Sequence, residues 1–184
     1  NDIAASILPD LLEENPKLEI SLKHDISQKI TEQVINLSLD IGIVINPVKH
    51  PDLIIHKLGN DETGFWVGSG NRKLKNIHSE NAVVVCIPDS MQTQSLLLKC
   101  KKLGITFNRM ITTTSMEVVV NVTAKGAGIG ILPARVAKSM HPHALKQLPK
   151  MPVFSDELCL IYRHENRDVK ALQKIITSIK KFYK

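Results

Sequence analysis

One stretch of the sequence, residues 118–133, limits the possible folds of this chain more than any other. It reads VVVNVTAKGAGIGILP, an apolar helical segment followed by three glycines within five residues, a very short apolar run and a proline. A dinucleotide-binding turn needs the opposite order, with the glycines between a strand and the helix that faces the phosphates. We therefore interpret Gly126 as a left-handed helix cap, and Gly128 and Gly130 as glycines that allow a tight entry into a buried strand at 129–132. Nucleotide binding is the less favoured alternative.

Helical and strand-like segments alternate along the rest of the chain, which predicts an α/β fold with largely parallel sheets. The apolar runs at 41–45 and 82–87 are typical of buried strands. The period-two alternation at 18–22 predicts another strand. Weaker strand signals lie at 54–58, 64–68, 105–111 and 157–163, and amphipathic helices are expected at 3–14, 26–37, 90–103 and 169–182.

Composition excludes several classes of protein. Aromatic residues make up only 4% of the 184 residues, too few for a stacking platform that binds single-stranded nucleic acid. No apolar run reaches the roughly 20 residues that span a bilayer. The three cysteines are widely spaced and odd in number, which fits a reducing compartment, so we expect a cytoplasmic protein.

The net charge of +6 is concentrated near the C-terminus, because residues 135–184 hold 11 Lys and Arg but only 4 Asp and Glu. This segment could face DNA or an acidic partner, or it could form the solvated face of the last helix; we favour the solvated face.

No group of residues has the spacing of a catalytic site, and we predict no enzymatic activity and no cofactor. His141 and His143 are separated by a single proline, but a metal site would need a third ligand that the sequence does not offer nearby, so we predict no metal.

Four segments, in order, resemble the effector-binding domain of LysR-type transcriptional regulators. Residues 126–133 resemble the family's G-x-G-I-x-x-L-P signature. Residues 4–12 and 15–22 resemble its opening I-x-x-x-L-P-x-L-L and P-x-V-x-L segments, and 39–44 resembles L-D-x-A-I with Gly42 in place of the alanine. Each motif is weak alone, but the four in this order cover essentially the whole chain.

The resemblance implies a two-lobed fold like that of the type-2 periplasmic binding proteins, each lobe a mostly parallel sheet flanked by helices. Lobe I would comprise 1–65 and 153–184, and lobe II 66–152. It also implies a homodimer, or a tetramer in the full-length protein, that senses a small metabolite, possibly a carboxylate, held between the lobes. DNA would be bound only by a winged helix-turn-helix domain that precedes this chain, and no membrane is involved.

The family's effector-binding loops fall on three sets of residues here: Asn1, Asp2, Ile3 and Ser6; His24 and Asp25; and Ser90, Met91, Gln92 and Thr93. Ser6, Ser90 and Thr93 could instead be helix caps. Where the family often has Thr-Pro, this chain has Asn1-Asp2, and the acid argues against a simple dianion as effector.

A second function class stays open, namely a solute-binding protein or small enzyme on the same fold. A winged helix-turn-helix before Asn1 would decide for the regulator.

Overall fold

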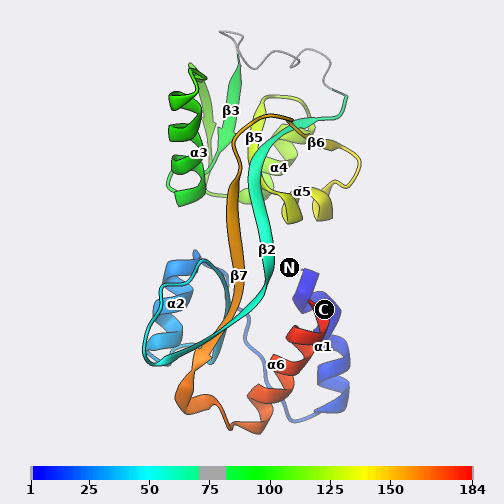
Figure 1. The fold of residues 1–184 in the computed structure, drawn as a ribbon. Helices are drawn as coiled ribbons and strands as arrows, with labels where there is room; N and C mark the ends of the chain where they lie inside the picture. The colour runs from blue at the N-terminus through cyan, green and yellow to red at the C-terminus, as the bar shows by residue number, and fades with distance from the viewer. Residues whose placement is uncertain (1, 71–81, 184) are drawn as a thin grey trace. The chain divides into compact units, whose positions relative to one another are not determined.

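The computed structural model describes residues 2–70 and 82–183. The helices are α1 (Asp2–Glu14), α2 (Ser27–Ile35), α3 (Met91–Lys102), α4 (Met116–Ala124), α5 (Ala134–Met140) and α6 (Lys170–Phe182), with a 3-10 turn at His164–Asn166 (Figure 1). The strands are β1 (Ile41–Ile45), β2 (Leu53–Gly68), β3 (Val83–Cys86), β4 (Arg109–Thr112), β5 (Ile129–Pro133), β6 (Leu145–Gln147) and β7 (Phe154–Arg163). No helix of the described residues is long and apolar enough to cross a membrane.

The strands follow the order β1-β7-β2-β5-β3-β4, and β6 pairs with β2 outside this path. The α/β class is therefore confirmed, but the sheet is mixed. β3 is parallel to both β4 and β5, as expected. β1–β7, β2–β5 and β2–β6 are antiparallel. Parallel pairing thus lies in unit 2, where β3 joins β4 and β5, whereas β1 and β7 of unit 1 pair antiparallel.

The chain forms two compact units. Unit 1 comprises Asn1–Asn60 and Asp156–Lys184, and unit 2 comprises Asp61–Ser155. The chain passes between them twice, once within β2 and once within β7.

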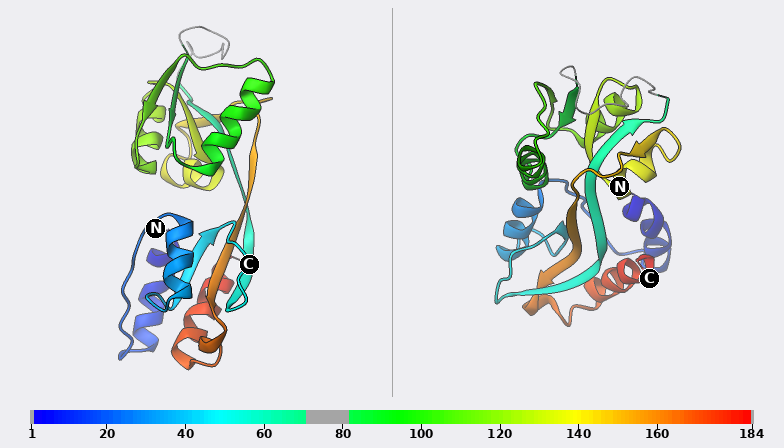
Figure 2. Two further views of the ribbon diagram at one scale, coloured as in Figure 1. Left: turned by 90° about the vertical axis from the view of Figure 1, so that its left-hand side faces the viewer. Right: turned by 45° about the horizontal axis from the view of Figure 1, so that its top comes forward.

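In unit 1, helices cover both faces of the strands: α2 lies on one side, and α1 and α6 lie on the other (Figures 1 and 2). Alternation along β7 decides which side chain faces which helix. Cys159 and Ile161 join the cluster of α2, whereas Leu160 and Tyr162 join the cluster of α6. The apolar stripe of α6 that packs there is Leu172, Ile176 and Ile179, as the sequence periodicity predicts.

In unit 2, β3 is fully buried between two helical layers. Val84 and Cys86 face the cluster of α3, which includes Leu96 and Cys100. Val85 faces the opposite way, into the cluster of α4 and α5. Trp66 and Leu132 belong to the same cluster, as do Val119, Val120 and Ala137. The indole of Trp66 also donates to the carbonyl of Leu132 at 3.0 Å, which satisfies its buried N–H.

The glycine cluster has the structural role expected from its order. Gly126 has φ +82°, and the amides of Gly126 and Ala127 donate to the carbonyls of Thr123 and Val122, which is the Schellman ending of a helix. A Cβ on Gly128 would lie 2.7 Å from the Val83 carbonyl oxygen. The glycines thus end α4 and bring β5 against β3.

Four strand expectations need correction. Residues 18–22 form no strand, and the described residues offer this segment no pairing partner for its amides and carbonyls. The segments 54–58 and 64–68 belong to one strand, β2, because pairing continues through the polar residues between them. Of the segment expected at 105–111, only the end forms a strand, β4 (Arg109–Thr112). A further strand, β6, forms by pairing with the end of β2.

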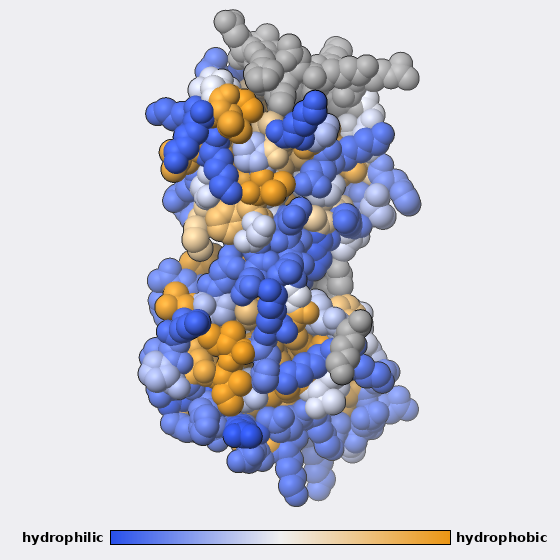
Figure 3. Space-filling model, in the orientation of Figure 1, coloured by the Kyte–Doolittle hydropathy of each residue, from blue (hydrophilic) through white to orange (hydrophobic). Residues whose placement is uncertain are grey.

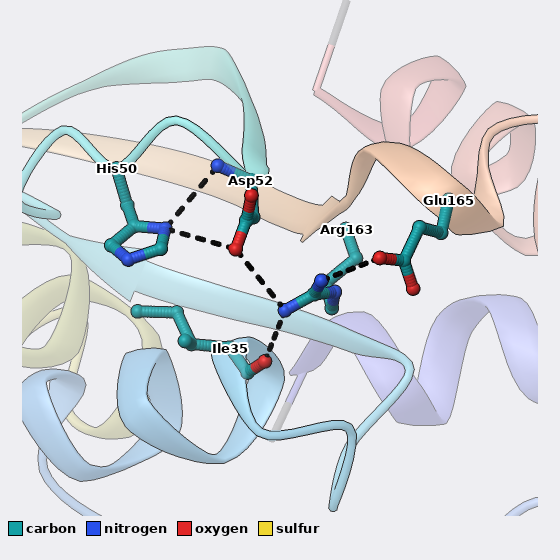
Figure 4. A network of polar contacts seen from close by, with 5 residues as sticks. All are labelled: Ile35, His50, Asp52, Arg163 and Glu165. Atoms are coloured by element: carbon teal, nitrogen blue, oxygen red, sulfur yellow. Dashed lines mark hydrogen bonds and ion pairs between the residues drawn. The ribbon is translucent and has the colours of Figure 1, made fainter.

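An arginine holds the C-terminal end of α2 in unit 1 (Figure 4). The guanidinium of Arg163, only 13% exposed, donates to the carbonyl of Ile35 at the end of α2 and to the carboxylate of Glu165 at 2.7 Å. It also lies 3.5 Å from the carboxylate of Asp52. A cation at a helix C-terminus is favourable, since the last carbonyls carry partial negative charge. This contact therefore fixes α2 to the ends of β2 and β7.

We predict that Gly128→Ala lowers the free energy of unfolding by about 1–3 kcal/mol, because the added methyl meets a backbone oxygen of β3 that cannot move aside. The matched control is Gly59→Ala in β2, where no atom lies within 4 Å of the added Cβ. Urea denaturation of both variants measures the difference. Equal stability of the two variants would show that the contact between a side chain at residue 128 and the Val83 carbonyl oxygen does not affect the free energy of unfolding.

Candidate functional site

The N-terminus of α3 in unit 2 carries the expected residues 90–93 in one turn. Ser90 is the N-cap, and its Oγ accepts from the amide of Thr93 at 3.1 Å. The same hydroxyl donates to the Thr93 hydroxyl at 2.8 Å. Thr93 is only 2% exposed, whereas Met91 is 58% exposed. Ser90 and Thr93 therefore stabilise the turn, and Met91 and Gln92 are the residues of this set that reach furthest toward solvent.

The parallel strands of unit 2 bring a second helix start beside this turn. β3 leads into the loop before α3, and its parallel neighbour β4 leads into the loop before α4. The amide of Thr113 donates to the carbonyl of Cys86 at 3.2 Å, which joins the two loops. Ser115 caps α4, with its Oγ accepting from the amide of Val118.

Loops at the carboxyl ends of parallel strands are the usual ligand-binding edge of such sheets. Thr113 and Ser115 are thus further candidate site residues, beyond those to which the family resemblance points.

In unit 1, His24 and Asp25 precede α2, which has no side-chain cap at its first residue. Asp25 accepts from the amide of Ile26 at 2.8 Å. The hydroxyl of Ser27 accepts from the amide of Ile45 at 3.0 Å and so fixes the start of α2 to the end of β1. A helix start without a side-chain cap presents N–H groups and partial positive charge, which suit a carboxylate.

The first set of expected residues can be placed only in part. Asn1 lies outside the described residues, as do the side chains of Asp2 and Ile3. Ser6 is exposed and lies inside α1, several residues after its start. It is therefore not the N-cap of this helix.

The three cysteines are buried and free; Cys86 and Cys159 lie in apolar runs of the sequence, whereas Cys100 is flanked by lysines and is buried on the inner side of α3. Burial raises the pKa of all three thiols, and that of Cys100 to about 11. The nucleophilic and metal-binding form of cysteine is the thiolate, so these residues are unsuited to redox or metal chemistry. The described residues also contain no group of three metal-binding side chains, and His141 instead contacts the amide oxygen of Asn121 at 2.9 Å.

Comparison with known proteins identifies the family. The family model described as the LysR substrate binding domain matches residues 1–184. This chain belongs to the LysR family. The curated relative YwbI of Bacillus subtilis, described as an uncharacterized HTH-type transcriptional regulator, is 24% identical over 167 residues. That match covers 86% of this chain and 55% of the relative, so the chain spans about half the length of that protein.

Solved regulatory domains of this family share the fold. The CcmR regulatory domain of Synechocystis PCC6803, solved in complex with 2-PG, has a TM-score of 0.73 at 17% identity and covers 99% of this chain and 93% of its own. The apo HypT regulatory domain of Salmonella typhimurium has a TM-score of 0.77 at 10% identity, with 98% and 90% coverage. The two-lobed periplasmic-binding-protein-like fold expected from the LysR motifs is therefore confirmed. The curated relative is described as a transcriptional regulator, and the two solved chains as regulatory domains.

We predict that the thiol of Cys100 resists alkylating and disulfide reagents in the folded protein. A pKa near 11 leaves about a hundredfold less thiolate near neutral pH than the ordinary value of 9.0 would. Timed labelling with a chromogenic disulfide, with and without urea, followed by peptide mass spectrometry, measures the protection. Labelling of Cys100 at the same rate in both conditions would contradict the assignment.

Proposed function

We propose that this chain is the effector-sensing domain of a cytoplasmic LysR-type transcriptional regulator. The observation that carries the proposal is the family match over residues 1–184, supported by the shared fold of the solved regulatory domains. In the full-length regulator, DNA is bound by an N-terminal winged helix-turn-helix domain, and this domain senses the metabolite and forms the oligomer.

The effector contacts two sets of residues in this proposal. In unit 1 these are His24 and Asp25 before α2, with Ser6 of α1. In unit 2 they are Ser90, Met91 and Gln92 at the start of α3, with Thr93 supporting the turn. Both loops open onto helix N-termini, whose amides favour an anionic group. A monocarboxylate fits better than a dianion, because Asp2 and Asp25 add negative charge near the starts of α1 and α2.

Burial separates the residues that would contact the effector from those that would support the turn. Thr93 is buried and supports Ser90, so it acts on the effector through the shape of the turn. Ser6 and His24 are exposed to solvent, and in this proposal they contact the effector directly.

Native mass spectrometry of the freshly purified chain tests the proposal by detecting retained small molecules. A panel of monocarboxylates and dicarboxylates is then titrated by calorimetry. The retained molecule, or a monocarboxylate, is expected to bind with 1:1 stoichiometry. Conversion of a metabolite of the panel into a product, with no molecule retained after purification, would instead favour the enzyme alternative.

We predict that Ser6→Ala weakens effector binding several-fold, since loss of one hydrogen bond costs about 1 kcal/mol, while the melting temperature stays nearly unchanged. The matched variant Thr93→Ala removes a buried hydroxyl that Ser90 bonds, so its melting temperature should fall. Calorimetry and thermal unfolding of both variants separate the two roles. A Ser6→Ala variant with lower stability and unchanged affinity would remove Ser6 from the site.

The oligomer is proposed to form through exposed apolar side chains on α3 and at the two ends of α2, in two copies of the chain related by a two-fold axis. Met91 and Leu98, seven residues apart on α3, are 58% and 56% exposed, and Ile26 and Leu37, which flank α2, are 61% and 55% exposed. Large apolar side chains at helical spacing on an exposed face are typical of an interaction surface.

We predict that Leu98→Glu converts the dimer to a monomer, because two charged side chains would be buried without partners in a two-fold interface. Val48→Glu is the control, since Val48 is 79% exposed and lies outside both helices. Sedimentation at tens of micromolar measures the change. A monomeric wild-type chain, or a dimeric Leu98→Glu variant, would contradict this interface.

A further inference from the structure

A surface depression of about 750 Å³ lies entirely within unit 1. Its walls come from the segment that leads into α6 and from α6 itself, and its base comes from β2 and β7. This volume is in the range of small-molecule sites. Every residue of its lining is described by the structure, and none belongs to the proposed effector loops.

Four cationic side chains line the depression, namely Arg167, Lys170, Lys174 and Lys180, against the single acid Asp168. Among the described residues, none of the four forms a salt bridge. Lys174 donates to the side-chain oxygen of Asn15, which is neutral. Unneutralised like charges that converge on a concave surface repel one another and create a strong local positive potential.

Two acids on the neighbouring elements pair with other cations, and among the described residues the α1 acids Asp10, Glu13 and Glu14 form no salt bridge with the four cations. Glu157 pairs with Lys57 at 2.7 Å, and Glu165 pairs with Arg163 at 2.7 Å. α6 itself contains no acid at all. Lys170 even lies in its first turn, where the helix dipole disfavours a cation. The positive charge therefore lacks internal compensation at this place.

The base of the depression supplies neutral polar groups. The rings of His56 and Tyr162 are stacked, with centroids 5.8 Å apart, and His56 Nε2 lies 3.2 Å from the Tyr162 hydroxyl. Burial, and then the charge of Lys180, lowers the pKa of His56. The imidazole is therefore neutral near pH 7, and the charge of Lys180 reaches the base of the depression.

We propose that this depression binds a small anion with at least two negative charges, of phosphate or polycarboxylate chemistry. The four cations would neutralise the anion, and the His56–Tyr162 pair would bond it from below. The site is separate from the proposed effector loops and does not depend on them. A concave site of this size suits a compact anion better than duplex DNA, whose phosphates lie along an extended surface.

The experiment uses inorganic pyrophosphate and citrate as probes, titrated into the 184-residue chain in low-salt buffer by calorimetry. NMR of the His56 ring reports where the anion lies. We expect at least one probe to bind 1:1 and to shift the His56 resonances. Pyrophosphate binding assigns phosphate chemistry, and citrate binding assigns polycarboxylate chemistry.

The variants Lys174→Gln and Lys180→Gln each remove one charge from the lining and should weaken binding about tenfold, the loss of one charge-assisted contact. The matched control is Lys181→Gln, on the same helix and next to Lys180 but outside the lining, which should bind as the wild type does.

Two outcomes would overturn the proposal. In the first, neither probe binds; binding of a short DNA duplex with the same lysine dependence would then indicate a nucleic-acid surface. In the second, Lys181→Gln weakens binding as much as Lys180→Gln, which would indicate a diffuse basic surface.

Discussion

The close packing of β5 against β3 and α4 is the contact on which unit 2 depends. β5 lies between β2 and β3 in the sheet, so it joins the antiparallel strands to the parallel ones. A Cβ at Gly130 would lie 2.3 Å from the hydroxyl of Thr123 on α4, and one at Gly128 would meet the backbone of β3. Because Gly128 and Gly130 have no side chains, β5 can pack directly against β3 and against α4. The left-handed Gly126 reverses the chain so that this approach is possible.

This packing also sets the position of the polar helix starts in unit 2. Because β3 and β4 are parallel, their carboxyl ends meet at one edge, and the loops before α3 and α4 lie there together. Ser90 and Ser115 then fix the first turns of the two helices by accepting from their amides. Such turns combine rigidity with hydrogen-bonding capacity, which is what recognition of a small metabolite requires.

Charge is distributed very unevenly over the surface of this domain. Hydrophilic side chains cover most of the face seen in Figure 3, with apolar side chains in smaller patches. Most cations on β2 and β7 have acidic partners nearby, as Lys57 and Arg163 show. Those that line the depression beside α6 form no salt bridge among the described residues, although they belong to the same unit and Asp168 lies in the same lining. A solvated helix face would explain exposed lysines, but convergence on one concave site with a neutral polar base needs a further reason.

The sequence alone determined the features that depend on local chemistry. The order of helix, glycines and strand at 118–133 decided against a phosphate loop, and the periodicity of 169–182 identified the buried stripe of α6. Burial of Cys86 and Cys159 agrees with the apolar runs in which they lie. The LysR motifs identified the family and the fold class.

What the sequence could not decide depends on partners far away in the chain. The alternation at 18–22 predicts a strand, but a strand exists only where a neighbour accepts its hydrogen bonds, and the described residues provide none. β6 exists because β2 provides such a neighbour. Likewise, composition indicates a basic C-terminal helix, but only the tertiary structure brings three of its lysines and Arg167 around His56 and Tyr162 without a salt bridge among the described residues, since β2, β7 and α6 meet there from distant parts of the sequence.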